Sequence, residues 1–149
     1  MISQSHKFIF VHIQKTAGNS IRLSIEPYCI EGLMFNEKQE EYNAELGAFH
    51  RFNIKNSPLK LGKHARLQTM YDAWDANTLG PWESYLKFTC VRNPWERLIS
   101  FYFSPHLERE AFDEEEFIAF AKSAVDKSQM GFVTMDGQLA VDRIVRYET

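Results

Sequence analysis

Cysteine is scarce in this sequence, with only Cys29 and Cys90 among 149 residues. Two cysteines cannot build a disulfide framework, and the spacing of cysteine and histidine does not match a zinc site. Long apolar runs are also lacking, since the first run, residues 8–13, has six residues and contains His12. A signal peptide needs an apolar core of about 7–15 residues and a membrane helix about 20. We therefore expect a cytoplasmic protein with no membrane segment and no bound metal.

An excess of positive charge is lacking too, because the net charge is −3, which argues against a nucleic-acid partner. The acidic residues cluster in residues 108–116, which hold six acids and one arginine. Within this cluster Asp113 and Glu116 have the spacing of a capping box, with Phe112 and Phe117 placed as a hydrophobic staple. Carboxylates favour the positive end of a helix, so we interpret the cluster as a helix start and not as a ligand site.

Apolar residues are plentiful, at 44% of the chain with 14% aromatic, and can fill the core of a single domain spanning residues 1–149. Short apolar runs predict strands at residues 7–13, 85–91 and 141–147, with weaker candidates at residues 30–35 and 59–62. Helical spacing predicts helices near residues 21–25, 67–79, 95–102 and 113–125. This alternation predicts a three-layer α/β/α fold around a central parallel sheet of about 4–5 strands, covered on both faces. Residues 37–58 have no persistent period and are either partly ordered or a functional loop.

A buried strand, a tight turn and a helix follow one another in residues 8–25. Such a turn presents backbone N–H groups and the positive end of a helix to an anion. Lys15 adds a charge, and Gly18 lets a phosphate approach the backbone closely. Side-chain donors in the same stretch are Thr16, Asn19 and Ser20. The lysine precedes the glycine, so the turn is not the GxxxxGK[ST] loop that binds nucleoside triphosphates. An ordinary βα turn with an exposed lysine is the alternative.

Residues 88–100 repeat the strand, turn and helix order. Arg92 lies where the strand ends, at the edge where open α/β sheets bind ligands, and Ser100 lies two turns into the helix. Arginine can grip a phosphate with two parallel hydrogen bonds, and a serine hydroxyl can add a third. Arg97 is either a ligand contact or part of an ion pair, at the surface or within the domain. Two such units on one sheet edge predict a ligand with two separated anionic groups.

These stretches together resemble the sulfotransferases that use 3′-phosphoadenosine-5′-phosphosulfate (PAPS), and the carbohydrate sulfotransferase-like group (family 2 type) in particular. FVHIQKTAGNS at residues 10–20 is similar to the 5′-phosphosulfate loop FVHIPKTAGTS, and VRNPWERLISFY at residues 91–102 is similar to the 3′-phosphate motif VRNPWDRLVSxY. GKHA at residues 62–65 resembles the segment that carries a catalytic histidine in some members. DRIVRYE at residues 142–148 resembles the DFIGRFE segment.

The resemblance implies a P-loop-like α/β fold and the transfer of a sulfuryl group from PAPS to a hydroxyl acceptor, with a carbohydrate as the family-level expectation. It implies that Lys15 neutralises charge on the leaving phosphate and that His64 is the base. Glu37, Glu40 and Glu41 remain alternative bases. The nucleotide PAPS, or its product 3′-phosphoadenosine-5′-phosphate (PAP), would be held by Lys15, Thr16, Ala17, Gly18, Asn19, Ser20, Arg92 and Ser100. No metal is implied, and the oligomeric state cannot be deduced. We expect His12, inside the first strand, to be structural.

Three departures from the family pattern bear on function. Gln14 replaces the usual proline and Asn19 the usual threonine, and both keep a small or polar turn residue. The sequence also stops at Thr149, shortly after the segment at residues 142–148, so it is either a minimal form or a truncated product. A module that binds PAP or PAPS without an acceptor pocket is therefore the alternative function. A small P-loop kinase is the third hypothesis, and the order of residues around Lys15 argues against it.

Overall fold

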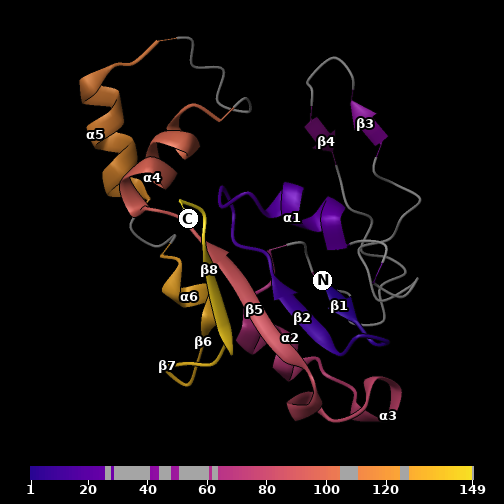
Figure 1. Ribbon diagram of the computed structural model, residues 1–149. Helices are drawn as coiled ribbons and strands as arrows, with labels where there is room; N and C mark the ends of the chain where they lie inside the picture. Colours follow the sequence, from indigo (N-terminus) through magenta and orange to yellow (C-terminus); the bar gives the residue numbers. More distant parts are fainter. Residues whose placement is uncertain are drawn as a thin grey trace.

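The computed structural model describes residues 1–25, 28, 61, 64–104, 111–124 and 128–148, together with the backbone of two short strands at residues 41–43 and 48–50. Its centre is a four-stranded sheet in the order β1-β2-β5-β8 (Figure 1). The strands are β1 (Ile2–Ser3), β2 (Phe8–Val11), β5 (Leu86–Val91) and β8 (Arg143–Arg146). β2, β5 and β8 run parallel, whereas β1 is antiparallel to β2. The fold is therefore mixed α/β with a mostly parallel sheet.

The three main predicted strands are confirmed at residues 8–11, 86–91 and 143–146, each shorter than expected. The antiparallel β1 was not predicted, so the expectation of an entirely parallel sheet is wrong. The candidate strand at residues 30–35 lies outside the described residues. In the candidate at residues 59–62 only Leu61 is described, and it belongs to no strand.

Helices pack on both faces of the sheet at β2. Ile9 and Val11 point toward α2 (Leu67–Asp72) and α6 (Met130–Val133), where Leu67 and Val133 complete the larger core. Phe10 points the other way and packs against one side of α1 (Gly18–Ile25). At the opposite edge all four residues of β8 are exposed, so the predicted cover on both faces does not extend to this strand.

The helix next to the second turn begins as its sequence predicted. α4 (Pro94–Tyr102) has proline at its first position, and the Asn93 side chain accepts a hydrogen bond from the backbone N–H of Trp95 at 2.9 Å. α5 (Glu114–Ser123) is capped by Asp113, whose side chain accepts from the N–H of Glu116 at 2.7 Å. The carboxylate of Glu116 instead accepts from the hydroxyl of Tyr102 at 3.0 Å, so only half of the predicted capping box forms.

The single helix predicted over residues 67–79 is two helices in the structure, α2 and α3 (Ala76–Leu79). Asp75 starts the second one, because its side chain accepts a hydrogen bond from the N–H of Asn77 at 3.0 Å. Trp74 turns out of the helical path, and its Nε1 donates to the carbonyl of Gly80 at 2.9 Å. An N-cap residue and the hydrogen bond of a half-buried indole therefore override the apolar periodicity.

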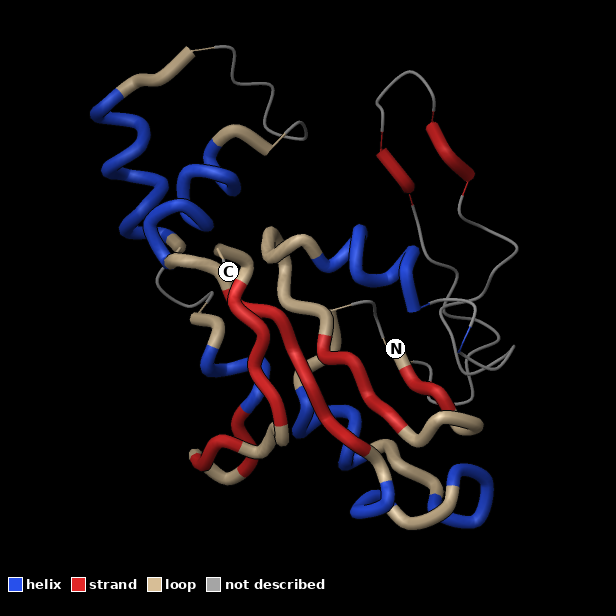
Figure 2. The backbone as a smooth tube through the Cα atoms, in the orientation of Figure 1, coloured by secondary structure: helices blue, strands red, loops and turns tan. Residues whose placement is uncertain are grey.

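The remaining elements are short: η4 (Trp82–Ser84), the pair β3 (Glu41–Asn43) and β4 (Ala48–His50), and the hairpin β6 (Thr134–Met135) and β7 (Gln138–Leu139). The β3–β4 pair falls in the segment at residues 37–58, which sequence analysis left as partly ordered or functional. Figure 2 shows α4 and α5 beyond the end of β5, and α6 with its hairpin beside β8. Among the helices of the described residues, none is both long and apolar enough to cross a bilayer.

Candidate functional site

The turn that joins β2 to α1 has an unusual backbone. Lys15 and Ala17 have positive φ angles of 62° and 61°, although neither is glycine. The left-handed conformation costs an L-residue about 1–2 kcal/mol, and such strain clusters at functional sites. Alternation of left-handed with other residues directs successive N–H groups to one side, which forms an anion-binding concavity. The backbone of this turn therefore fits the anion site that its sequence predicted.

Two residues of the turn, Thr16 and Gly18, serve its own structure. Thr16 is fully buried, and its Oγ1 donates to the carbonyl of Ile13 at 2.9 Å, so this hydroxyl closes the turn rather than facing solvent. At Gly18 a Cβ atom would lie 1.9 Å from the ring of His12. Glycine is therefore needed here because a side chain would collide with the ring of His12. This adds to the sequence-based expectation that glycine lets a phosphate approach the backbone closely. Asn19 and Ser20 are exposed in the first turn of α1.

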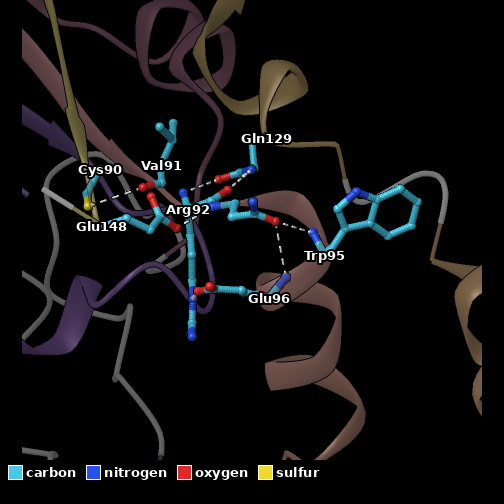
Figure 3. Close-up of polar contacts among 8 residues, drawn as sticks. Cys90, Val91, Arg92, Trp95, Glu96, Gln129 and Glu148 are labelled. Carbon is cyan, nitrogen blue, oxygen red and sulfur yellow. Dashed lines mark hydrogen bonds and ion pairs between the residues drawn. The ribbon is translucent and has the colours of Figure 1, made fainter.

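Arg92 follows β5 directly, and its side chain lies beside that of Glu96 (Figure 3). Its guanidinium lies over the ring of Tyr147, 4.5 Å from the ring centroid, and its Nε is 3.5 Å from a carboxylate oxygen of Glu96. Within the described residues its two terminal nitrogens make no hydrogen bond or ion pair. Ser100 lies one helical turn beyond Glu96, on the same face of α4.

Arg97 connects the two turns. Its Nε donates to the carbonyl of Gln14 at 2.8 Å, and its guanidinium lies 4.8 Å from the ring centroid of Phe101. The side chain is only 6% exposed, and this burial lowers the pKa of Arg97 below its usual value. Arg97 therefore links the first turn to α4 through a hydrogen bond to a backbone carbonyl.

Lys15 and Arg92 are close enough to repel one another. Burial lowers the pKa of Lys15, and the positive charge of Arg92 lowers it further. Among the described residues Lys15 has no carboxylate partner, and this edge of the sheet carries three cations, Lys15, Arg92 and Arg97, beside the carboxylates of Glu96 and Glu148. Like charges held together without equal countercharge favour a bound anion.

His64 lies against the start of the first turn. Its Nδ1 is 2.9 Å from the carbonyl oxygen of His12, and the two rings meet edge to face with centroids 4.6 Å apart. A carbonyl can only accept, so Nδ1 carries the proton and the lone pair of the neutral ring is on Nε2. His12 is buried and stacks on Phe10, consistent with the structural role expected for it. The structure thus brings His64 to the same turn as Lys15.

The three glutamates predicted as alternative bases have no described side chain. Glu37 and Glu40 lie outside the described residues, and only the backbone of Glu41 is described, in β3.

A hollow of about 330 Å³ lies between Leu98 of α4 and the end of α5. At 100° per residue Leu98 and Ser100 point to opposite sides of α4, so this hollow is behind the helix and away from Ser100.

Three contacts of the site were not foreseen: the side chain of Gln129 on the backbone of Arg92, the ring of Tyr147, and the carboxylate of Glu148 on the N–H of Asn93. The resemblance of residues 142–148 to a family segment pointed to Tyr147 and Glu148, whereas no sequence signal pointed to Gln129. In the described part of the chain no group of three histidine, cysteine, aspartate or glutamate residues could hold a metal.

Comparison with known proteins identifies the class. The chain matches the model of the Sulfotransferase family over residues 1–131, a stretch that contains both turns and His64 and ends within α6. The chain belongs to this family. No curated protein and no solved structure matches it.

Proposed function

We propose that the protein transfers a sulfuryl group from PAPS to a hydroxyl group, with a carbohydrate as the acceptor on family resemblance alone. The observation that carries the proposal is the left-handed turn at Lys15 and Ala17 next to the Arg92 side chain. The turn suits the 5′ end of the nucleotide, and Arg92 with Ser100 suits the 3′-phosphate. Arginine binds a phosphate through two parallel hydrogen bonds, which would distinguish PAPS from ATP.

In the proposed reaction the bond between sulfur and the oxygen that bridges it to the 5′-phosphate breaks, and sulfur bonds to the acceptor oxygen. The bridging oxygen keeps the electron pair and leaves as part of PAP. Lys15 donates a hydrogen bond to this oxygen and stabilises the charge that develops on it, as in phosphoryl transfer. Burial and the nearby charge of Arg92 lower the pKa of Lys15. Negative charge that develops on the bridging oxygen offsets this repulsion and so favours the charged lysine, which fits the proposed role.

His64 accepts the proton of the acceptor hydroxyl at Nε2. The hydrogen bond from Nδ1 to the carbonyl of His12 fixes the required tautomer and stabilises the cation that forms. Because His12 directly precedes the turn, the same backbone segment orients the base and begins the anion site. Replacement of His64 with alanine should reduce kcat about 10²–10⁴-fold, with little change in PAP affinity.

The deciding experiment combines calorimetric titration with PAP and ATP and a transfer assay with PAPS. We expect PAP to bind more tightly than ATP, the Arg92→Ala variant to lose this preference, and Lys15→Met to lose turnover. Lys122→Met, an exposed change in the last turn of α5, is the matched control and should behave as wild type. Equal affinity for the two nucleotides would refute the 3′-phosphate assignment. PAP binding without transfer to any hydroxyl acceptor would instead favour a non-catalytic nucleotide-binding module.

A further inference from the structure

Gln129 pairs with the backbone of Arg92 much as a neighbouring strand would. Its Oε1 accepts from the backbone N–H of Arg92 at 2.9 Å, and its Nε2 donates to the backbone carbonyl of Arg92 at 2.8 Å (Figure 3). Arg92 is the first residue after β5, where the strand ends. The contact is partly buried, so removal of the Gln129 side chain would leave an amide and a carbonyl without partners.

Tyr147 and Glu148 reach the same turn from the end of β8. The N–H of Tyr147 donates to the carbonyl of Val91 at 2.8 Å, which extends the contact between β5 and β8. The Tyr147 ring lies 4.5 Å from the Arg92 guanidinium, and Glu148 Oε1 accepts from the N–H of Asn93 at 2.5 Å. The backbone of each residue from 91 to 93 is thus hydrogen-bonded to Gln129, Tyr147 or Glu148.

These contacts fix the side chain of Arg92 as well as its backbone. The Tyr147 ring covers one face of the guanidinium, and the carboxylate of Glu96 lies beside Nε at 3.5 Å. Among the described residues the terminal nitrogens, which form the bidentate face of arginine, make no hydrogen bond to either group. A guanidinium held in place before binding loses less conformational freedom when a phosphate arrives, which increases affinity.

We propose that Gln129, Tyr147 and Glu148 are positioning residues that give the protein its preference for a nucleotide with a 3′-phosphate. The inference rests on the proposed function, because it assigns Arg92 to that phosphate. It extends the site to the residue that precedes α6 and to the two residues that follow β8, and Tyr147 and Glu148 lie beyond the residues that match the family model.

The test compares the affinity for PAP with that for adenosine 5′-phosphosulfate, which lacks the 3′-phosphate. Tyr147→Leu should weaken PAP binding about two- to tenfold, the range of a cation–π contact, and leave adenosine 5′-phosphosulfate unaffected. Tyr147→Phe keeps the ring and should retain wild-type affinity. Gln129→Met should weaken PAP binding selectively, whereas Gln138→Met, an exposed glutamine of β7, is the matched control.

A double-mutant cycle separates positioning from a general structural role. Added to Arg92→Ala, Tyr147→Leu should cause no further loss of PAP affinity, because the group that it positions is gone. A structural role predicts an equal loss for both nucleotides and additive effects in the cycle, and either result would overturn the proposal. The Glu148→Gln variant keeps an acceptor for Asn93 and should bind PAP better than Glu148→Ala.

Failure of the proposed function gives a different result. Wild-type protein that binds both nucleotides equally, or neither, refutes the assignment of Arg92 to the 3′-phosphate. The positioning itself is then judged in the ligand-free protein from the NMR order parameter of the Arg92 Nε–H group. Tyr147→Leu and Gln129→Met should lower it, and an unchanged value in both variants would overturn the inference whatever the nucleotide.

Discussion

Replacement of Gly18 with alanine adds one methyl group where α1 meets the ring of His12. That carbon would lie 1.9 Å from both Cδ2 and Nε2 of the ring and 2.9 Å from Cε1, far inside normal contact. The ring cannot swing away easily, because it is 3% exposed and lies between Phe10 and His64. Overpacking of a core costs about 1–3 kcal/mol, and the confined ring puts this variant near the upper value. At roughly 2–4 °C per kcal/mol for a chain of this length, Tm should fall by about 6–12 °C.

The assay is urea unfolding of the Gly18→Ala variant followed by far-ultraviolet circular dichroism. Gly131 in α6 provides the control, since a Cβ there meets nothing within 4 Å, and Gly131→Ala should be neutral or stabilising by up to about 1 kcal/mol. In a His12→Ala background the added methyl group has room, so the double variant should be more stable than the two single losses predict. A Gly18→Ala protein that unfolds at the wild-type urea concentration would refute the packing argument.

Three further predictions follow from single contacts. A bound anion favours the charged form of Lys15, whose pKa in the free protein is lowered from the ordinary value of 10.5. The affinity for PAP should therefore fall as the pH rises through that lowered pKa, and calorimetry in this pH range should show that binding takes up protons. An affinity that does not change with pH would contradict this prediction. Burial and then the charge of Glu148 raise the pKa of the Cys90 thiol, so Glu148→Gln should lower it, as measured by thiolate absorbance in a Cys29→Ser background; an unchanged titration would contradict this effect of Glu148. Asp113→Ala should cost about 1 kcal/mol in urea unfolding through loss of the α5 cap, while the exposed Glu115→Ala should not, and equal effects would refute the capping role.

Local signals were sufficient for much of the fold. Asn93 followed by proline predicted the start of α4, and Asp113 predicted the start of α5, because a capping side chain acts within three residues of itself. Apolar runs predicted β2 and β5, because a strand that is buried on both faces is apolar throughout its length. The short β1 gave no such signal, as two residues are too few to show a period.

The candidate site was predictable in its parts but not in its connections. The two turns could be placed at one edge because the carboxyl ends of parallel strands meet there. The left-handed backbone at Lys15 and Ala17 could not be foreseen, because neither residue type favours it. The bond from Arg97 to Gln14 joins residues far apart in sequence and depends on how α4 packs. The need for glycine at position 18 likewise depends on the ring of His12, which only the folded chain brings there.

The pairing of β8 with β5 has a consequence for synthesis. β8 emerges from the ribosome more than fifty residues after β5, and until then the outer edge of β5 has no strand partner. An unpaired edge invites association with other chains, and the nascent protein is therefore most vulnerable to aggregation in this interval. Once β8 docks, the carbonyl of Val91 and the turn that follows it gain their partners together. The turn at Arg92 should thus reach its final conformation only after β8 has been synthesised.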